Sequence, residues 1–267
     1  MLFNKPVLNI AYSKLYGVPI PMNTAEVYKQ ACEFGFDCIK GDVTPSADGK
    51  LVMCHDDVFH LDENGRVLEP WVKDARRSKL YINQLTLAEC KALEYADEPC
   101  KENLGYYAHP TELEEMIKIC HEYGKIAYLT VRDQQIELCV DEIYRLLKKY
   151  DMVNQCIINS FTPETLQAMR RKDPNIVLSR VFGADIPVTI EDVDVCVKLK
   201  PSIFCFFSLT QCLKTQEVYD QSKAAFDYAK QNGVALHFAQ AADREFYTWA
   251  LEHGFTGVQC LVLKTCF

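Results

Sequence analysis

The sequence predicts an α/β fold, a (β/α)8 TIM barrel in which eight parallel strands alternate with helices. Three observations predict it. The chain has 267 residues, a usual length for such a barrel. Short runs that are apolar at most positions recur along the whole sequence, as is typical of parallel strands covered by helices. Helical segments separate these runs, which favours a closed barrel over an open sheet.

The strands are predicted from the apolar, β-rich runs, taken in chain order. Each run is short and is followed by a segment with helical character. The predicted strands are Val7–Tyr12, Cys38–Val43, Ile126–Val131, Gln155–Asn159, Ile176–Val181, Ile203–Phe207, Val234–Phe238 and Gly257–Leu261.

The helices are predicted from start and stop signals. Thr86 to Glu89 and Thr111 to Glu114 have the spacing of a capping box, and Pro163 suits a first helical turn. Several segments end at a glycine, the residue favoured just after a helix. The predicted helices are Thr24–Phe34, Thr111–Tyr123, Gln135–Tyr150, Thr162–Lys172, Thr189–Lys198, Thr215–Asn232 and Asp243–His253.

One segment interrupts the alternation. Residues 56–108 lie between the second and third strands and are too long for a plain loop. They contain a turn signal at Asp62–Gly65 and a short predicted helix at Thr86–Leu93. We expect one barrel domain over residues 1–267, with residues 56–108 as an insertion that covers the barrel mouth.

The composition narrows the class of protein. A formal charge of −8 argues against binding to nucleic acid, which needs clustered lysine and arginine. The sequence shows neither a signal peptide nor an apolar run of the ~20 residues that a membrane helix needs. The thirteen cysteines form no Cys-x-x-Cys pair, so we expect buried, reduced thiols and a cytoplasmic location.

The ends of the first two strands carry the most informative motifs, because catalytic residues of such barrels lie at the carboxyl ends of strands. There the chain reads N-I-A-Y-S from residue 9, P-M-N-T from residue 21, G-F-D-C-I-K-G-D-V from residue 35 and D-G-K-L-V-M-C-H-D-D from residue 48. This series resembles the glycerophosphodiester phosphodiesterase family, which has I-A-H-R-G, P-E-N-T, G-x-D-x-I-E-x-D-V and D-G-x-x-V-x-x-H-D. Weaker similarities at residues 109–115, 159–161 and 236–243 extend the resemblance over the chain.

The resemblance implies hydrolysis of a glycerophosphodiester to glycerol phosphate and an alcohol, and hence a role in lipid or glycerophosphodiester metabolism. In the family, two histidines act as acid and base around a divalent metal ion. Here Tyr12 stands at the first histidine position, Lys40 at the first metal glutamate and Thr130 at the glutamate of the third strand. Asp42 and His55 match the family pattern.

These departures change the expected chemistry. Lys40 and Asp42 are two residues apart on a strand, so they face the same way and are expected to form an ion pair. Hard divalent ions need several oxygen ligands, and two of the three carboxylates are replaced. A positive charge at ~4 Å also repels each unit of cation charge by about 4 kcal/mol at an effective dielectric of ~20. We therefore expect no bound metal and no other cofactor.

The candidate residues follow from this comparison. Tyr12 is a poor base near neutral pH because its ordinary pKa is about 10. The remaining histidines lack metal-ligand spacing and are expected to be structural or on the surface. The catalytic candidates are His55, Lys40, Asp42 and Tyr12, and the candidates for binding an anionic ligand are Arg132, Arg180 and Thr130.

Three functions remain open at this point. The first is a family member that has lost or greatly weakened metal-dependent hydrolysis and binds a small phosphorylated or polyol ligand. The second is an active phosphodiester hydrolase in which Lys40 replaces the metal and His55 is the acid or base. The third is a barrel scaffold or interaction protein. Metal-independent turnover would identify the second function, and a ligand without turnover would identify the first.

Overall fold

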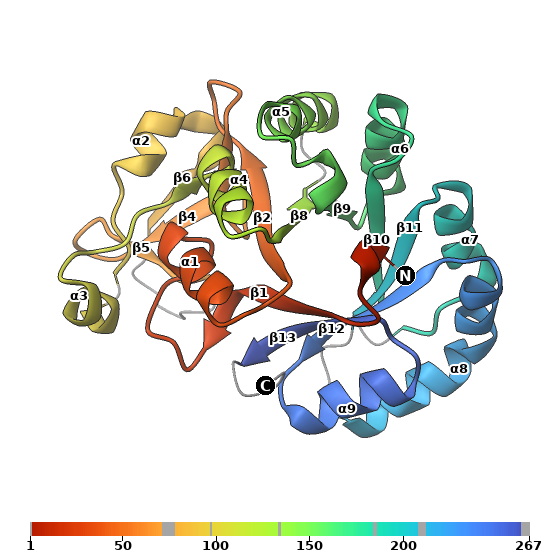
Figure 1. Ribbon diagram of the computed structural model, residues 1–267. Helices are drawn as coiled ribbons and strands as arrows, with labels where there is room; N and C mark the ends of the chain where they lie inside the picture. Colours follow the sequence, from red (N-terminus) through yellow and green to blue (C-terminus); the bar gives the residue numbers. More distant parts are fainter. Residues whose placement is uncertain are drawn as a thin grey trace.

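The computed structural model describes residues 2–70, 78–96, 98–132, 135–183, 186–207 and 212–262. Eight parallel strands of this part close into a barrel, because β1 pairs with both β2 and β13 (Figure 1). The predicted fold class is confirmed. Around the barrel the strands are β1 (Leu8–Tyr16), β13 (Gly257–Val262), β12 (Ala235–Ala241), β11 (Ser202–Phe207), β10 (Val177–Gly183), β9 (Cys156–Ser160), β8 (Ile126–Val131) and β2 (Cys38–Pro45).

Alternation along each strand separates the barrel interior from the layer of helices, because successive side chains point to opposite faces. In β12, Ala235 packs with apolar interior residues near the amino ends of the strands. Ala239 packs with apolar interior residues near the carboxyl ends. Leu236 and Phe238 belong to the large outer core shared with the helices. His237 lies between Ala235 and Ala239 on the inner side and is fully buried.

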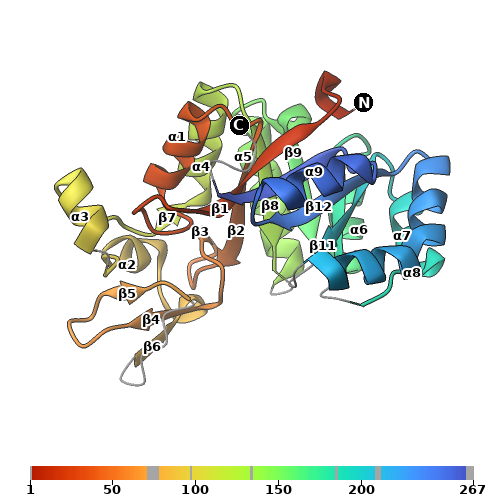
Figure 2. The ribbon, with the colours of Figure 1, turned by 90° about the horizontal axis from the view of Figure 1, so that it is seen from below.

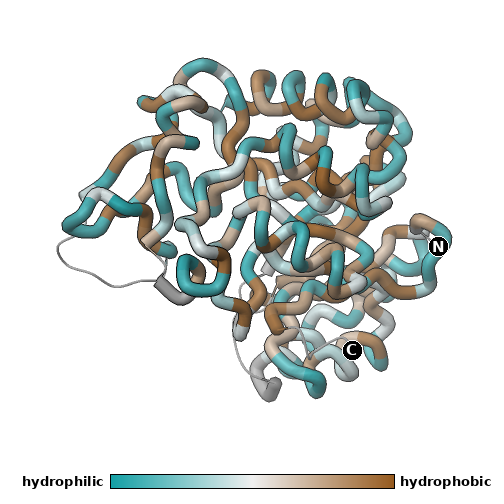
Figure 3. The backbone as a smooth tube through the Cα atoms, turned by 60° about the vertical axis from the view of Figure 1, so that its left-hand side comes forward, coloured by the Kyte–Doolittle hydropathy of each residue, from teal (hydrophilic) through white to brown (hydrophobic). Residues whose placement is uncertain are grey.

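Helices cover the outer face of the barrel (Figure 1). Their apolar and polar residues alternate along the tube of Figure 3, as expected for helices with one face on a core and one in solvent. The outer helices are α1 (Ala25–Glu33), α4 (Leu113–Glu122), α5 (Ile136–Lys149), α6 (Pro163–Lys172), α7 (Ile190–Lys198), α8 (Cys212–Gln231) and α9 (Arg244–Glu252), with 3-10 turns at Leu2–Asn4, Ile82–Gln84 and Val153–Gln155.

The two predicted capping boxes had different outcomes. The box of Thr86 and Glu89 is present at the start of α2. The box of Thr111 is wrong, because α4 begins after Glu112 and no side chain caps it. Thr111 instead belongs to a short strand, and its hydroxyl accepts a hydrogen bond of 2.7 Å from the amide of Ala25. The hydroxyl of Thr111 therefore binds the first residue of α1, whereas the local sequence predicted that it would cap α4.

The region between β2 and β8 contains its own small sheet. Its elements gather at one side of the barrel (Figures 1 and 2). A cluster of buried residues that includes Phe59, Ile82 and Tyr95 forms their core. The partly buried ion pair of Lys14 and Glu69, 2.8 Å apart, joins the region to the end of β1. The elements are β3 (Leu51–Met53), β4 (Val58–Leu61), β5 (Val67–Leu68), β6 (Ser78–Tyr81), α2 (Leu87–Lys91), α3 (Glu98–Leu104) and β7 (Thr111–Glu112).

Most of the cysteines whose side chains the structure describes are buried free thiols, as the sequence predicted. Cys260 on β13 differs, because it is disulfide-bonded, so the prediction of thiols throughout is wrong at that position. Within the described ranges, no helix is both long enough and apolar enough to cross a membrane.

Candidate functional site

A cavity of about 210 Å³ opens at the carboxyl ends of the barrel strands. This is the end at which residues from neighbouring strands converge in such barrels. The sequence-predicted residues Tyr12, Lys40, Asp42, His55, Thr130 and Arg132 lie together in its wall. The other described residues of the wall are Asn159, Phe161, Val181, Phe207, Ala239, Gln240 and Gln259.

Lys40 and Asp42 form a buried ion pair inside this cavity. The ammonium of Lys40 lies 2.8 Å from Oδ1 of Asp42, and the two residues are 6% and 1% exposed. The ammonium also lies 4.7 Å from the ring centre of Tyr12, over its π face. Burial by itself would raise the pKa of Asp42, but Lys40, His55 and Arg132 together hold it well below its ordinary range. Asp42 is therefore a carboxylate at neutral pH.

Asn23 fixes the other side of the Asp42 carboxylate. Its side-chain amide is 3.4 Å from Oδ2 of Asp42, and its Oδ1 accepts a hydrogen bond of 3.1 Å from the Asp42 amide. The hydroxyl of Tyr28 donates to the same Oδ1 at 2.9 Å. Asn23 has a φ of 55°, a left-handed conformation that asparagine tolerates better than most residues. This local geometry holds Asp42 in place before any ligand arrives.

His55 follows β3 and forms a dyad with its neighbour. Its Nδ1 lies 2.8 Å from Oδ1 of Asp56, and about a third of each side chain is exposed. This hydrogen bond lowers the pKa of Asp56. Because Nδ1 is engaged with a carboxylate, Nε2 is the ring nitrogen available for exchanging a proton with a ligand. The local sequence thus supplies both the ring and the group that orients it.

Arg132 and Thr130 bring polar groups from the end of β8. Nε of Arg132 is buried without a hydrogen-bond partner in the described part of the chain. The charge of Arg132 also contributes to the low pKa values of Asp42 and Asp56. Oγ1 of Thr130 accepts a hydrogen bond of 3.0 Å from the amide of Asn159, so its own proton is available to a ligand. These groups suit recognition of an anion.

Arg180 lies elsewhere. Its two neighbours on β10 both face the interior. Ser179 is hydrogen-bonded to Tyr128 inside the barrel, and Val181 lines the cavity. Arg180 is therefore directed away from the interior, and its Nη1 donates a hydrogen bond of 3.0 Å to the carbonyl of Phe161. It is absent from the described wall of the cavity.

Sequence reasoning did not single out two polar residues of the site. Asn23 supports Asp42, and Asn159 supports Thr130, in each case through a side-chain amide. Both fall inside motifs that carried the resemblance, P-M-N-T from residue 21 and N-S-F from residue 159. That position within a motif was the available signal, because their supporting role depends on contacts between segments that are distant in the sequence.

The residues present do not fit a divalent cation. Asp42 is the one carboxylate of the described wall, and its two oxygens already face Lys40 and Asn23. Across the described ranges, no group of three or more histidine, cysteine, aspartate and glutamate side chains is arranged to hold a metal ion. The ammonium of Lys40 already binds Oδ1 of Asp42, the oxygen that such an ion would need as a ligand.

Comparisons with known proteins agree on one family. The model of the glycerophosphoryl diester phosphodiesterase family matches residues 14–258. A glycerophosphodiester phosphodiesterase of Caldanaerobacter subterraneus is 25% identical over 171 residues, which cover 61% of this chain. Another from Bacillus subtilis is 27% identical over 203 residues, which cover 70% of this chain. The matched segments span 62% and 63% of the length of these relatives.

Solved structures share the fold at low sequence identity. A phosphodiesterase of Oleispira antarctica, determined in complex with the product sn-glycerol-3-phosphate, aligns with a TM-score of 0.73 and 19% identity over 97% of this chain and 94% of that one. A glycerophosphodiester phosphodiesterase of Agrobacterium tumefaciens aligns with a TM-score of 0.71 and 14% identity over 97% of this chain and 98% of that one.

Proposed function

This chain belongs to the glycerophosphoryl diester phosphodiesterase family, and from that premise we propose that it binds a small phosphorylated polyol while metal-dependent hydrolysis is lost or strongly weakened. One observation carries the proposal. The ammonium of Lys40 lies 2.8 Å from Asp42, at the position where the family resemblance places a metal-binding glutamate. A fixed monovalent cation thus takes the place of an exchangeable divalent one.

The cavity suits the phosphate group of such a ligand. Arg132 offers a guanidinium with an unpartnered Nε, and His55 and Thr130 offer further groups in the same wall. A volume of about 210 Å³ restricts the ligand to a small molecule. The related phosphodiesterase of Oleispira antarctica was determined with sn-glycerol-3-phosphate, and that compound is the ligand we propose first for this chain.

The same geometry explains why hydrolysis would be slow. In hydrolysis a water oxygen attacks phosphorus, the bond from phosphorus to the alcohol oxygen breaks, and the water proton passes to a base as the leaving oxygen gains one. A bound metal ion would stabilise the charge on the phosphate oxygens by several kcal/mol. Lys40 carries one charge, already paired with Asp42, and a lost acid or base typically costs about 10²–10⁴-fold in rate.

A second function rests on the dyad of His55 and Asp56. In this alternative, Nε2 of His55 takes the proton of the attacking water, the hydroxyl of Tyr12 supplies the proton to the leaving alcohol, and Lys40 stabilises the phosphate charge. The orienting contact from Asp56, 2.8 Å from the ring, favours this reading. It predicts turnover that is insensitive to chelators.

Binding of sn-glycerol-3-phosphate tests the main proposal. Titration calorimetry should show saturable binding to the wild-type protein without added metal. Arg132→Met should weaken binding about tenfold or more, because a hydrogen bond to a charged group is worth about 1.5–3 kcal/mol. Arg180→Met is the matched control and should leave the affinity unchanged, because that arginine is directed away from the cavity. Absence of binding, or equal effects of the two substitutions, would contradict the proposal.

A further inference from the structure

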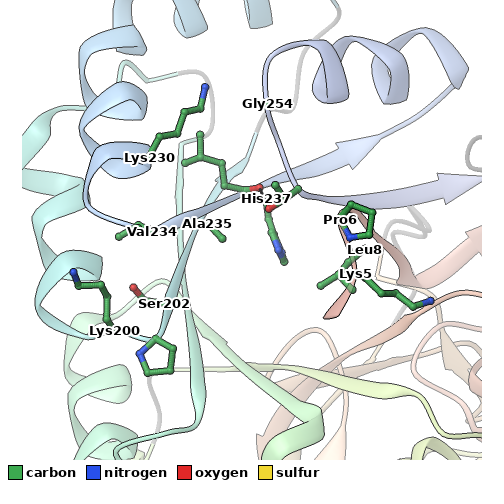
Figure 4. A pocket seen from close by; sticks show the side chains of 14 residues that line it. Lys5, Pro6, Leu8, Lys200, Ser202, Lys230, Val234, Ala235, His237 and Gly254 are labelled. Atoms are coloured by element: carbon green, nitrogen blue, oxygen red, sulfur yellow. Dashed lines mark hydrogen bonds between the residues drawn. The ribbon is translucent and has the colours of Figure 1, made fainter. Parts of the chain in front are cut away.

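A second cavity, of about 700 Å³, opens at the other end of the barrel. Residues at or beside the starts of four neighbouring strands line it, among them Leu8, Ser202, Ala235 and Thr256 (Figure 4). The strands are parallel, so this is the end opposite the site of Lys40 and Asp42. Its volume lies in the range of cavities that bind small molecules, roughly 300–1,000 Å³. Active sites of such barrels lie at the opposite end, at the carboxyl ends of the strands.

His237 of β12 belongs to the wall of this cavity, and its ring lies just beneath the wall surface. Figure 4 shows its ring between Ala235 and Leu8, at the centre of the residues that line the opening. The residue is fully buried, and neither Nδ1 nor Nε2 has a hydrogen-bond partner in the described part of the chain. Burial lowers the pKa of this histidine to about 3, so its ring is neutral at physiological pH. A neutral imidazole offers one donor and one acceptor, and both are unused here.

The backbone makes room for this ring. A Cβ at Gly257 on β13 would lie only 2.5 Å from Nε2 and Cδ2 of His237. Glycine at that position allows the imidazole to lie against the neighbouring strand. A buried polar group without a partner costs about 1–3 kcal/mol of stability. The polar ring is therefore retained at a cost, and a ligand that hydrogen-bonds it would remove that cost.

Lysines surround the same opening. Lys5 forms an ion pair with Asp37, so its charge is neutralised. Lys200 and Lys230 donate to backbone carbonyls, at 3.0 Å and 3.2 Å, and form no ion pair within the described residues. Two exposed positive charges thus lie at the edge of a cavity whose wall includes an imidazole without a hydrogen-bond partner in the described part of the chain. The wall between them is largely apolar, from Pro6, Leu8, Pro201, Val234, Ala235 and Leu236.

We propose that this cavity binds a small organic anion that has an apolar body and a hydroxyl group. The hydroxyl pairs with one ring nitrogen of His237, either donating to the bare nitrogen or accepting from the N–H, after a small movement of the wall uncovers the ring. The anionic end pairs with Lys200 and Lys230, whose long side chains reach it from the edge. The apolar body lies on the aliphatic wall. Hydroxylated fatty acids and hydroxyalkyl phosphates share this chemistry.

Three probes of equal length separate these contributions. ω-Hydroxyoctanoate carries the charge and the hydroxyl, octanoate lacks the hydroxyl, and octanediol lacks the charge. Calorimetry on the full chain should show the tightest binding for ω-hydroxyoctanoate. Nuclear magnetic resonance of labelled histidine should show that this probe shifts the ring nitrogens of His237, whereas octanoate shifts them less. The ring signals report directly on the wild-type protein and need no variant.

Substitutions then assign each contact. His237→Phe keeps a ring without polar atoms, and should lower the affinity for ω-hydroxyoctanoate about tenfold, to that of octanoate, without changing the affinity for octanoate. The double substitution Lys200→Gln with Lys230→Gln should weaken the binding of ω-hydroxyoctanoate and of octanoate. It should leave the binding of octanediol unchanged. Lys118→Gln, on α4 and outside this cavity, is the control for loss of a surface charge.

Two results would overturn the proposal. One is the absence of saturable binding of ω-hydroxyoctanoate at millimolar concentration, together with unchanged His237 ring signals. The other is saturable binding that neither His237→Phe nor the two lysine substitutions weaken more than Lys118→Gln does. A second hydroxylated anion, an ω-hydroxyalkyl phosphate, distinguishes a site for carboxylates from one for phosphate esters. Loss of sn-glycerol-3-phosphate binding at the other end of the barrel would leave this result untouched.

Discussion

Lys40 and Asp42 face each other across 2.8 Å in the cavity at the carboxyl end of the barrel, and both are almost fully buried. The pair leaves each charge compensated, with Asn23 and Tyr12 as further neighbours. A buried ion pair contributes little when intact, because desolvation offsets the attraction. Removing one partner, however, leaves a buried charge without compensation.

We therefore expect Asp42→Asn to destabilise the fold by about 3–5 kcal/mol. The double substitution Asp42→Asn with Lys40→Met should recover most of that loss, because no charge then remains buried. Urea unfolding at neutral pH measures both. If the double variant is no more stable than Asp42→Asn alone, the uncompensated ammonium is not the cause of the loss.

The buried His237 should make stability depend on pH. Its pKa falls from 6.5 to about 3 in the fold, so between these values the unfolded chain binds a proton that the folded chain does not. Stability is therefore lost as pH falls below about 6.5, at up to about 1.4 kcal/mol for each pH unit. His237→Phe should flatten this dependence. Denaturant midpoints of the two proteins from pH 7 to pH 4 test it, and parallel curves would contradict it.

Metal affinity should respond to the residue at position 40. Calorimetry with millimolar Mg²⁺ or Ca²⁺ should show no specific site at Asp42 in the wild type, because the ammonium of Lys40 occupies the place of a ligand. Replacing Lys40 and Thr130 together with glutamate should create a saturable site. A metal site in the wild-type protein that disappears in Asp42→Ala would contradict this prediction, because it would show that the cation displaces the ammonium from Asp42.

Much of the fold could be predicted from the sequence, because barrel strands and outer helices are encoded by local patterns. The strand Ile126–Val131 was predicted with its observed bounds. The pairing of Lys40 with Asp42 followed from the two-residue period of a strand. The small sheet of β4, β5 and β6 was not predicted, since its strands have two to four residues and depend on pairing with one another.

The parts of the two cavities that escaped prediction are set by contacts between distant segments. His237 was expected to be structural, and only the fold places its ring beside the starts of β1 and β11 without a partner. Arg180 was a ligand candidate because it lies near the end of a strand, yet the parity of β10 directs it away from the interior. A shift of one residue along the strand turns a side chain from the outer face to the interior, and this alternation decides whether it reaches the site.

Turnover of glycerophosphocholine, followed by phosphorus nuclear magnetic resonance, tests the central claim most directly. The wild-type protein should release glycerol phosphate very slowly or not at all, and neither added Mg²⁺ or Ca²⁺ nor a chelator should change the rate. Robust turnover that needs a metal ion and is lost in Asp42→Asn would contradict the claim. Robust turnover that is insensitive to chelator and lost in His55→Ala would also contradict it, in favour of the lysine-assisted hydrolase.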